Sequence, residues 1–311
     1  MTVDQPDATQ WHAGFACPAG RPNAGKSTLT NALVGDKVAI TSSKPQTTRH
    51  TIRGIVTRDH QQLILVDTPG LHRPRTLLGE RLNDLVRETL LEVDVIGFCL
   101  PADQKVGPGD TYIARDPAEL QRAKRVPVVA IATKSDKVDR ERLAEHLIAI
   151  DQLGDWAAII PCSAVRGDPV EELFGVLVEH LPTSPAALSP EGQLSDEDDD
   201  KMIAELVREA ALEGVRDELP HSPAVVVEEI VPREGRPDDD PMLDVRVNVF
   251  VERDSQKAII IGRGGSRLRE VGTTARVGIE KLLGSKVFLD LHVKVAKDWQ
   301  RDPKQLQRLG F

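Results

Sequence analysis

The chain has 311 residues, of which 40% are hydrophobic and 29% charged, and its formal charge is −9 at pH 7. The length predicts two domains, and the composition excludes an intrinsically disordered chain. The longest apolar stretch, residues 126–132, is far shorter than the ~20 residues that a bilayer span needs, so no transmembrane helix is expected. Because residues 1–6 carry neither a basic start nor an apolar core, we expect no secretory signal and a cytoplasmic protein.

The distribution of charge and cysteine narrows the class further. Residues 191–240 hold 5 basic and 17 acidic side chains, whereas residues 241–311 hold 14 basic and 8 acidic ones. A basic C-terminal segment is a hint of nucleic-acid contact, although ordinary solvated surface charge gives the same counts. Cys17, Cys99 and Cys162 lie beside apolar segments without metal-binding spacing, which predicts buried thiols.

The first part of the chain, residues 1–182, alternates short apolar runs with amphipathic segments. This is the pattern of an α/β domain with a mostly parallel sheet flanked by helices. Pro18 removes a hydrogen-bond donor from the first run, so we expect that strand to be shortened or locally weakened. The predicted strands are 14–19, 62–66, 93–100, 126–132 and 157–161, and the predicted helices are 25–33, 77–91 and 169–180.

A phosphate-binding motif follows the first apolar run. Residues 20–27 read GRPNAGKS, which matches GxxxxGK[ST] between a strand and a helix. Glycines allow backbone N–H groups to turn toward phosphate oxygens, and the helix N-terminus adds positive potential. We expect Lys26 to reach the β- and γ-phosphates and Ser27 to hold Mg²⁺. The expected phosphate contacts are Gly20, Arg21, Pro22, Asn23, Ala24, Gly25, Lys26, Ser27 and Thr28.

Two further segments are expected beside the γ-phosphate. Residues 67–70, DTPG, follow the apolar run 63–66, which places Asp67 near the metal and the flexible Gly70 near the γ-phosphate. Residues 45–49, PQTTR, offer two hydroxyls that could close on metal and phosphate as a switch loop, with a solvated turn as the alternative. The expected metal ligands are Ser27, Thr48 and Asp67, the expected catalytic residues are Lys26, Thr48 and Gly70, and Thr68 and Pro69 complete the nucleotide contacts.

The next polar segments are expected to bind the base. Residues 133–136, TKSD, follow the apolar run 126–132. A carboxylate at Asp136 accepts from both the ring N–H and the amino group of guanine, which adenine cannot offer, so GTP is favoured over ATP. The pair Ser163-Ala164 is expected to supply a backbone N–H. The expected base contacts are Thr133, Lys134, Ser135, Asp136, Ser163 and Ala164.

These five segments, in this order, resemble the guanine-nucleotide motifs of translation-factor-related GTPases, and the whole chain resembles the Era family of ribosome-assembly GTPases. GRPNAGKST, PQTTRH, DTPGLH and the Ser-Ala pair occupy the expected places. The resemblance implies that Thr48 is the switch threonine, that GTP is hydrolysed to GDP and phosphate with Mg²⁺, and that K⁺ stimulates the reaction near Asn23. Thr133 departs from the usual Asn-Lys-x-Asp motif and cannot donate an amide to the purine, so weaker base affinity is expected.

The residues after Gly70 predict a slow reaction. Leu71 stands where Ras-like enzymes place the glutamine that orients the attacking water. Because an apolar side chain cannot orient water, the intrinsic rate is expected to be low. The adjacent His72 is expected to be a bystander.

A second domain is predicted after a linker. Residues 182–201 are rich in proline, serine and acidic residues and fit neither a helical nor a strand period. The periods beyond them predict a helix from 202 to about Asp217, strands at 224–231 and 243–251, helices on both sides of 262–265 and a strand at 286–295. This α-β-β-α-α-β order predicts an α+β domain over 201–311, after a first domain at 1–182 and a linker at 183–200.

The second domain carries a GXXG motif, GRGG, at residues 262–265, which clamps a nucleic-acid backbone in RNA-binding modules. In this setting it resembles the type II KH domain of the Era family, with a plain helix–helix turn as the alternative. In the family this domain binds the 3′ end of 16S ribosomal RNA, which implies a role in assembly of the 30S subunit. The expected RNA contacts are Lys257, Gly262, Arg263, Gly264, Gly265, Arg267 and Arg269.

Some expectations stay open at this point. Trp299 is either a base-stacking platform or a packing residue. We expect a monomer, and the resemblance leaves room for peripheral contact with the inner face of the cell membrane, although no basic amphipathic helix predicts it. The alternative function is an RNA-binding protein with a weakened or non-hydrolysing nucleotide site, motivated by Pro18 and Thr133. A P-loop phosphotransferase is disfavoured because Asp136 would have no purpose in it.

Overall fold

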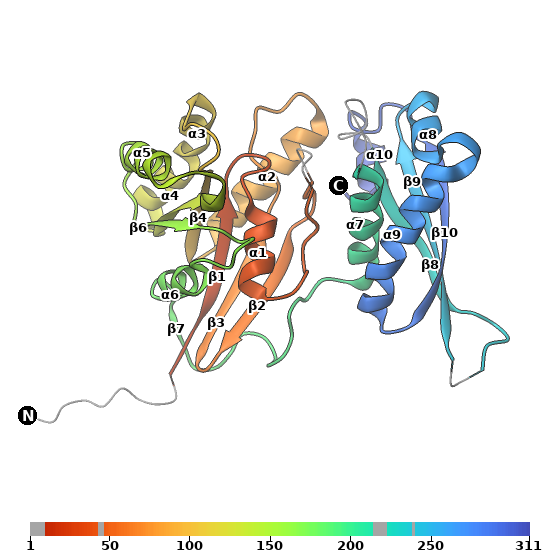
Figure 1. Cartoon of the computed structure of the whole chain (residues 1–311), viewed down its shortest axis with the longest axis horizontal. Helices are drawn as coiled ribbons and strands as arrows, with labels where there is room; N and C mark the ends of the chain where they lie inside the picture. The colour runs from red at the N-terminus through yellow and green to blue at the C-terminus, as the bar shows by residue number, and fades with distance from the viewer. Residues whose placement is uncertain (1–9, 43–46, 214–222, 238–239) are drawn as a thin grey trace, which may run out of the picture. The chain divides into compact units, whose positions relative to one another are not determined.

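The computed structural model describes residues 10–42, 47–213, 223–237 and 240–311 (Figure 1). Pro45 and Gln46 of the expected switch loop, the N-terminal residues 1–9 and the expected helix end near Asp217 lie outside these ranges. The chain forms two compact units. The first comprises Met1–Ala39, Thr48–Arg73 and Leu82–Asp196, and the second comprises Ile40–Thr47, Pro74–Arg81 and Glu197–Phe311.

The first unit is built on a seven-stranded sheet whose main strand order is β2-β3-β1-β4-β5-β6. Pairing is parallel except for β2 against β3 and for the short β7 against β1. This confirms the mostly parallel sheet expected from the sequence. The strands are β1 (Trp11–Ala19), β2 (Ile52–Arg58), β3 (Gln61–Asp67), β4 (Val95–Pro101), β5 (Val128–Thr133), β6 (Ala158–Cys162) and β7 (Thr183–Ser184).

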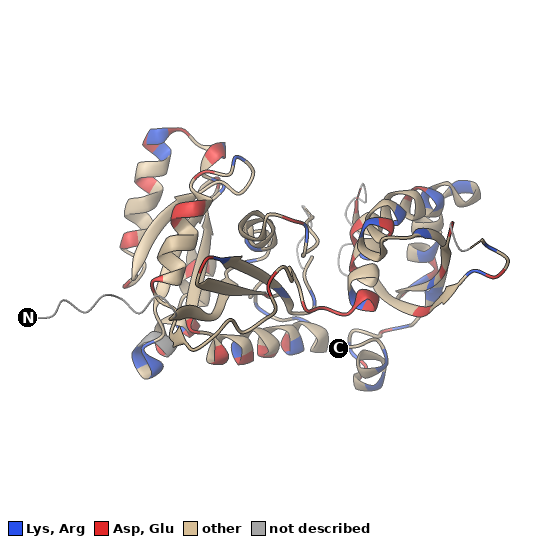
Figure 2. Ribbon diagram, turned by 90° about the horizontal axis from the view of Figure 1, so that it is seen from below, with Lys and Arg blue, Asp and Glu red and all other residues tan. Residues whose placement is uncertain are grey.

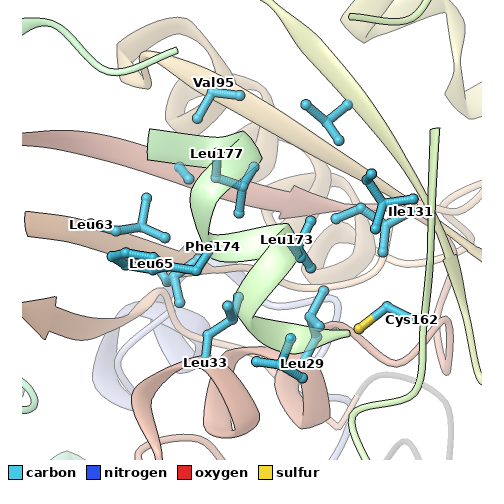
Figure 3. Packing of buried hydrophobic residues seen from close by; sticks show 14 of the residues in the cluster. Leu29, Leu33, Leu63, Leu65, Val95, Ile131, Cys162, Leu173, Phe174 and Leu177 are labelled. Carbon is cyan, nitrogen blue, oxygen red and sulfur yellow. The ribbon is translucent and has the colours of Figure 1, made fainter. Parts of the chain in front are cut away.

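Helices cover both faces of this sheet, so the central strands β4 and β5 are buried along their whole length. Leucine and phenylalanine side chains of α1 and α6 pack on one face (Figure 3), and side chains of α2, α3 and α5 pack on the other. The helices are α1 (Lys26–Val34), α2 (Leu77–Glu92), α3 (Pro108–Ile113), α4 (Arg115–Lys124), α5 (Arg140–Asp151) and α6 (Val170–Val178). Because polar residues follow β1, β3, β5 and β6, the parallel order brings them to one edge of the sheet.

Of the two expected effects of Pro18, a shortened or a locally weakened β1, the structure contradicts the first, because β1 continues to Ala19. The register with β3 ends at Ala16↔Leu65, whereas the register with β4 continues through Pro18↔Gly97 to Ala19. Thr68 Oγ1 donates to Pro18 O at 3.5 Å, so the polar groups of Pro18 face the side where pairing with β3 has already ended. The missing N–H therefore removes no ladder bond.

The segment expected to be a linker is bound to the first unit over much of its length. Leu188 N and Ser189 N donate to Gln62 Oε1 at 2.7 and 2.8 Å, and Ile55 N donates to Leu194 O at 2.9 Å, so the segment covers the edge strand β2. The acidic run at 196–200 then leads into α7 (Figure 2).

The second unit contains a three-stranded sheet of order β10-β9-β8, in which β10 and β9 are parallel and β9 and β8 antiparallel. Valine side chains from one face of this sheet pack against α7 and α9. The expected α-β-β-α-α-β order is confirmed, with α7 (Asp199–Leu212), β8 (Ala224–Pro232), β9 (Met242–Val251), α8 (Asp254–Ile261), α9 (Ser266–Leu283), β10 (Lys286–Val295) and an added α10 (Pro303–Arg308).

Two segments from the first half of the chain belong to the second unit. Glu209 of α7 accepts from Thr41 N at 2.9 Å, and Arg208 donates to Thr47 O. Leu78 N donates to Gln300 O at 3.0 Å. Within the described residues, no helix is both long enough and apolar enough to span a membrane.

Candidate functional site

The phosphate-binding motif forms a loop between β1 and α1, as its sequence position predicts. Gly20 and Gly25 have φ angles of 146° and 92°, and Asn23 has a φ of 61°. A Cβ on Gly20 would lie 2.7 Å from Cys99 O, so only glycine fits there. The Lys26 side chain lies along the loop, with Nζ 3.1 Å from Arg21 O and 3.4 Å from Gly20 O.

Three oxygen-bearing side chains expected to hold the metal meet at the start of α1. Ser27 Oγ donates to Asp67 Oδ2 at 2.6 Å and lies 2.9 Å from Thr48 Oγ1, which is 3.4 Å from the same carboxylate oxygen. Asp67 is fully buried, and its other oxygen, Oδ1, has no hydrogen-bond partner. Because such an orphaned buried oxygen is costly without a cation or donor, this hydroxyl-carboxylate set fits Mg²⁺.

The charges of Lys26 and Asp67 act on each other. Burial lowers the pKa of the Lys26 ammonium, and the Asp67 carboxylate opposes this shift. Burial raises the pKa of Asp67, and the positive charge of Lys26 and the hydroxyls of Ser27 and Thr48 oppose it. Because both groups are buried, the negative charge of bound phosphates and the positive charge of a bound metal would interact strongly with them.

The segment after Asp67 lies directly on the phosphate loop. A Cβ on Gly70 would be 2.4 Å from Pro22 N, so this contact requires glycine. Leu71 N donates to Gly20 O at 3.1 Å, and the Leu71 side chain is buried in the core. The His72 ring contacts its own segment, with Nδ1 3.0 Å from Gly70 O.

A pocket of about 160 Å³ lies where the base is expected. Asp136 lines this pocket, and one of its oxygens, Oδ1, accepts from Ser163 Oγ at 2.7 Å. Ser163 N already donates to Asp168 O at 2.6 Å, which leaves the N–H of Ala164 to serve a base. The lining residues are Gly25, Thr28, Leu29, Thr133, Lys134, Asp136, Lys137, Cys162, Ala164 and Val165. Of the expected base contacts, Ser135 and Ser163 are not among them. Lys137 was missed because it lies just beyond the motif, and Leu29, Cys162 and Val165 were missed because apolar residues carry no motif.

The GXXG motif forms the turn between α8 and α9, with Gly262, Gly264 and Gly265 at φ angles of 72°, 61° and 77°. A Cβ on Gly262 would lie 2.9 Å from Arg267 N, whereas one on Gly264 would meet nothing within 4 Å. The exposed Gly264 and Arg263 therefore leave the turn open to a backbone that approaches from solvent.

A groove of about 330 Å³ runs from this turn between α9 and β10. Of the expected RNA contacts, Gly265 and Arg269 line it. Arg267 instead donates to Glu270 at 2.8 Å and to Ala210 O at 3.4 Å. Arg276 and Phe288, which also line the groove, were missed. Phe288 is 48% exposed, and the signal in the sequence is that it alternates with polar residues, Lys286, Asp290 and His292, on the outward side of β10.

Two other expectations concern buried residues. Trp299 is fully buried and stacks on Phe311 with ring centroids 5.5 Å apart, so it is a packing residue and not a base-stacking platform. The three cysteines are free and buried, as predicted.

Comparisons with known proteins cover both units. A family model described as a 50S ribosome-binding GTPase matches residues 16–134, and a KH domain model matches residues 218–300. GTPase Era of Streptomyces coelicolor is 66% identical over 316 aligned residues, which cover 100% of this chain and 98% of the relative. GTPase Era of Mycobacterium avium is 63% identical over 304 aligned residues, which cover 97% of this chain and 100% of the relative.

Two solved structures resemble the chain along nearly its whole length. A crystal structure of Era in complex with MgGDPNP and nucleotides 1506–1542 of 16S ribosomal RNA matches with a TM-score of 0.88 and 34% identity, covering 96% of this chain and 99% of that one. A structure of an Aquifex aeolicus Era variant bound to GDP and AlF4⁻ matches with a TM-score of 0.87 and 34% identity, with the same coverage.

Proposed function

The chain belongs to the Era family of GTPases, and we propose that it binds GTP with Mg²⁺ on the phosphate loop, hydrolyses it slowly, and binds the 3′ end of 16S ribosomal RNA during assembly of the 30S subunit. The expected family and the expected fold class, a GTPase domain followed by a KH domain, are confirmed. The relatives are bound to the guanine nucleotides and the RNA fragment that this proposal assigns to the present chain.

The observation that carries the nucleotide proposal is the meeting of Ser27, Thr48 and Asp67 with an unpartnered carboxylate oxygen. These residues would hold Mg²⁺, which supplies a Lewis acid for phosphate oxygens when bound. Lys26 would neutralise charge on the β- and γ-phosphates, and Gly70 is close enough to offer its N–H beside the loop. The alternative, an RNA-binding protein with a weakened or non-hydrolysing nucleotide site, is disfavoured because Ser27, Thr48 and Asp67 lie within hydrogen-bonding distance of one another.

The residues around Gly70 support a low intrinsic rate. Leu71 directs its side chain into the core, and the His72 ring is engaged with Gly70 O, so neither is placed to orient a water. Charge stabilisation by the loop and the metal then provides most of the acceleration. We also propose that K⁺ stimulates turnover near Asn23; equal turnover in sodium and potassium buffers would exclude this.

The RNA proposal rests on the groove between α9 and β10 that continues from the GXXG turn. Arg263 and Arg269 would contact the RNA backbone, and the exposed ring of Phe288 would stack on a base. We further propose a cytoplasmic monomer, which light scattering on the purified protein tests, and sedimentation with anionic vesicles tests any peripheral membrane contact.

The decisive experiment measures both activities on variants of each site. Filter binding with GTP, ATP and an oligonucleotide of the 16S 3′ end should show GTP and RNA binding by the wild type. Lys26→Ala should abolish GTP binding and leave RNA affinity in the absence of nucleotide intact, since no part of the groove is changed. Loss of both activities would contradict separate sites.

Gly264→Asp should lower RNA affinity by about tenfold or more, because it places a negative charge at the clamp. The matched control is Gly284→Asp. Gly284 has a φ of 60° and open space around its Cβ position, like Gly264, but it lies at the other end of α9. Equal RNA affinity of the two variants would remove the GXXG turn from the interface.

A further inference from the structure

Thr133 stands where the usual motif has asparagine, and its hydroxyl is bound to the phosphate loop. Thr133 is the last residue of β5 and is buried, and its Oγ1 donates to Ala24 O, an acceptor in the phosphate loop, at 2.5 Å. Contact between the two segments is close, because a Cβ on Gly25 would meet Thr133 Cβ and Oγ1 at 3.5 Å. The side chain therefore ties the base pocket to the phosphate loop.

A hydroxyl has one proton, so this bond fixes what Thr133 can offer to a base. A carbonyl oxygen only accepts, and the hydroxyl must therefore donate to Ala24 O. Guanine presents N7 and O6 as acceptors, and Thr133 has no second proton to donate to either. The other pocket side chains near it, Leu29 and Cys162, form part of the apolar core.

The edge of guanine that carries the ring N–H, the amino group and O6 has hydrogen-bond partners in the pocket. Asp136 is fixed by Ser163 and accepts from the ring N–H and the amino group, and the N–H of Ala164 remains for O6. Accordingly, we infer that this chain recognises guanine through N1, N2 and O6, that N7 receives no hydrogen bond from residue 133, and that Thr133 is a positioning residue for the phosphate loop. This inference rests on the proposed nucleotide site and names how that site selects its base.

The test compares GDP with 7-deaza-GDP, in which a C–H replaces N7, by competition against a fluorescent GDP with the full-length protein. The wild type should bind the two nucleotides with affinities within about twofold, because no hydrogen bond is lost. Thr133→Asn adds an amide with two protons, which can donate to Ala24 O and N7 together, and should prefer GDP by about fivefold.

Two more variants separate positioning from base contact. Thr133→Val leaves Ala24 O without its donor and should weaken GDP and 7-deaza-GDP equally, by about fivefold or more. Thr133→Ser keeps the hydroxyl and should restore both affinities.

Two outcomes would overturn the inference. The first is a wild-type preference for GDP of fivefold or more over 7-deaza-GDP. The second is a loss in Thr133→Val that is confined to GDP. Equal affinity for both nucleotides in Thr133→Asn would still support the absence of an N7 contact, because it would place N7 beyond the reach of residue 133. Absence of any GDP binding would instead overturn the proposed function, and this inference with it.

Discussion

In the proposed nucleotide site, the carboxylate of Asp136 would select guanine by accepting hydrogen bonds from its ring N–H and its amino group. Ser163 Oγ fixes this carboxylate at 2.7 Å, so little side-chain freedom is lost when a base binds. A pocket with one fixed acceptor discriminates strongly against a ring that offers no matching donor, because the acceptor is then buried without a partner. We therefore expect the base preference to depend on both Asp136 and Ser163.

Asp136→Asn should invert this preference. The amide can donate to the C2 oxygen of xanthine, whereas it meets the amino group of guanine with one of its own donors. We expect GTP affinity to fall by about 100-fold and XTP affinity to rise above that of GTP. Competition binding with GTP, XTP and ATP measures both changes, and ATP, which should stay a poor ligand throughout, is the control. A variant that still prefers GTP would contradict the role of Asp136.

The thiols provide a second prediction at this scale. Burial raises the pKa of Cys17 and Cys99 to about 12 and that of Cys162 to about 11. The native protein should therefore react with no thiol reagent at pH 8, and the denatured protein should react at all three cysteines. Because the folded pKa values lie above the unfolded value of 9.0, the thiols' contribution to stability is complete below pH 9 and falls as the pH rises further. Rapid native reaction at Cys17 or Cys99 would show that the core opens.

At the scale of elements, α3 holds the phosphate loop from the side. Arg21 Nε lies 2.6 Å from Asp110 Oδ1, and Asp110 is almost fully buried and also accepts from Gly107 N at 2.9 Å. The Asp110 carboxylate thus caps the start of its own helix and also forms an ion pair with Arg21 of the phosphate loop. The loop is positioned by α3 as well as by β1 and α1.

Asp110→Ala should lower the free energy of unfolding by about 1–3 kcal/mol, since it leaves Arg21 without its ion-pair partner and Gly107 N without its acceptor. GTP affinity should fall as well, because the loop loses a contact that orients it. The control is Asp84→Ala, which removes an exposed ion pair with Arg87 and should cost at most ~0.5 kcal/mol. Urea unfolding measures both changes. Equal stabilities of the two variants would show that the buried pair does not anchor α3.

The elements differ in how well the sequence predicts them. Buried parallel strands such as β4 and β5 appear as continuous apolar runs, and α9 and α7 have clear helical periods, so all four were predicted. The edge strand β2 was missed because Gly54 interrupts its apolar pattern, although Thr51, Ile52, Ile55, Val56 and Thr57 are β-branched. The helix α3 was missed because it is only six residues long and begins with Pro108 and Gly109. The helix α4 was missed because it has few apolar residues, and α5 because its apolar residues do not gather on one face.

The residues of the site also differ in how well the sequence predicts them. Residues in fixed motifs, such as Lys26, Ser27 and Asp136, could be proposed from the sequence because phosphate and guanine impose a spacing. The contact of Thr133 with Ala24 O joins positions more than a hundred residues apart, and no local pattern predicts it. The binding of the segment 183–196 along β2 and the groove residue Phe288 likewise depend on tertiary packing.

At the scale of the whole molecule, the segment 40–47 belongs to the second unit, and the next residue in the chain, Thr48, belongs to the first. Its first end is held by Glu209 of α7 through Thr41 N, and its last residue, Thr47, accepts from Arg208. Thr47 is followed directly by Thr48, whose hydroxyl meets Ser27 and Asp67. We predict that a change in the position of Thr48 on nucleotide exchange alters the contacts of Thr47 with α7, which packs against α9, a helix that lines the proposed RNA groove.

Glu209→Ala should weaken the dependence of RNA affinity on the bound nucleotide, because Thr41 N loses its acceptor while α7 keeps its packing. We expect the ratio of RNA affinities measured with a GTP analogue and with GDP to move toward one, while RNA affinity without nucleotide changes by less than about threefold. Glu213→Ala is the matched control, since Glu213 is an exposed glutamate that follows the last residue of the same helix. Fluorescence anisotropy with the 16S 3′-terminal oligonucleotide measures all of these affinities. An unchanged ratio in Glu209→Ala, with the wild-type ratio clearly different from one, would show that the nucleotide state reaches the RNA by another route.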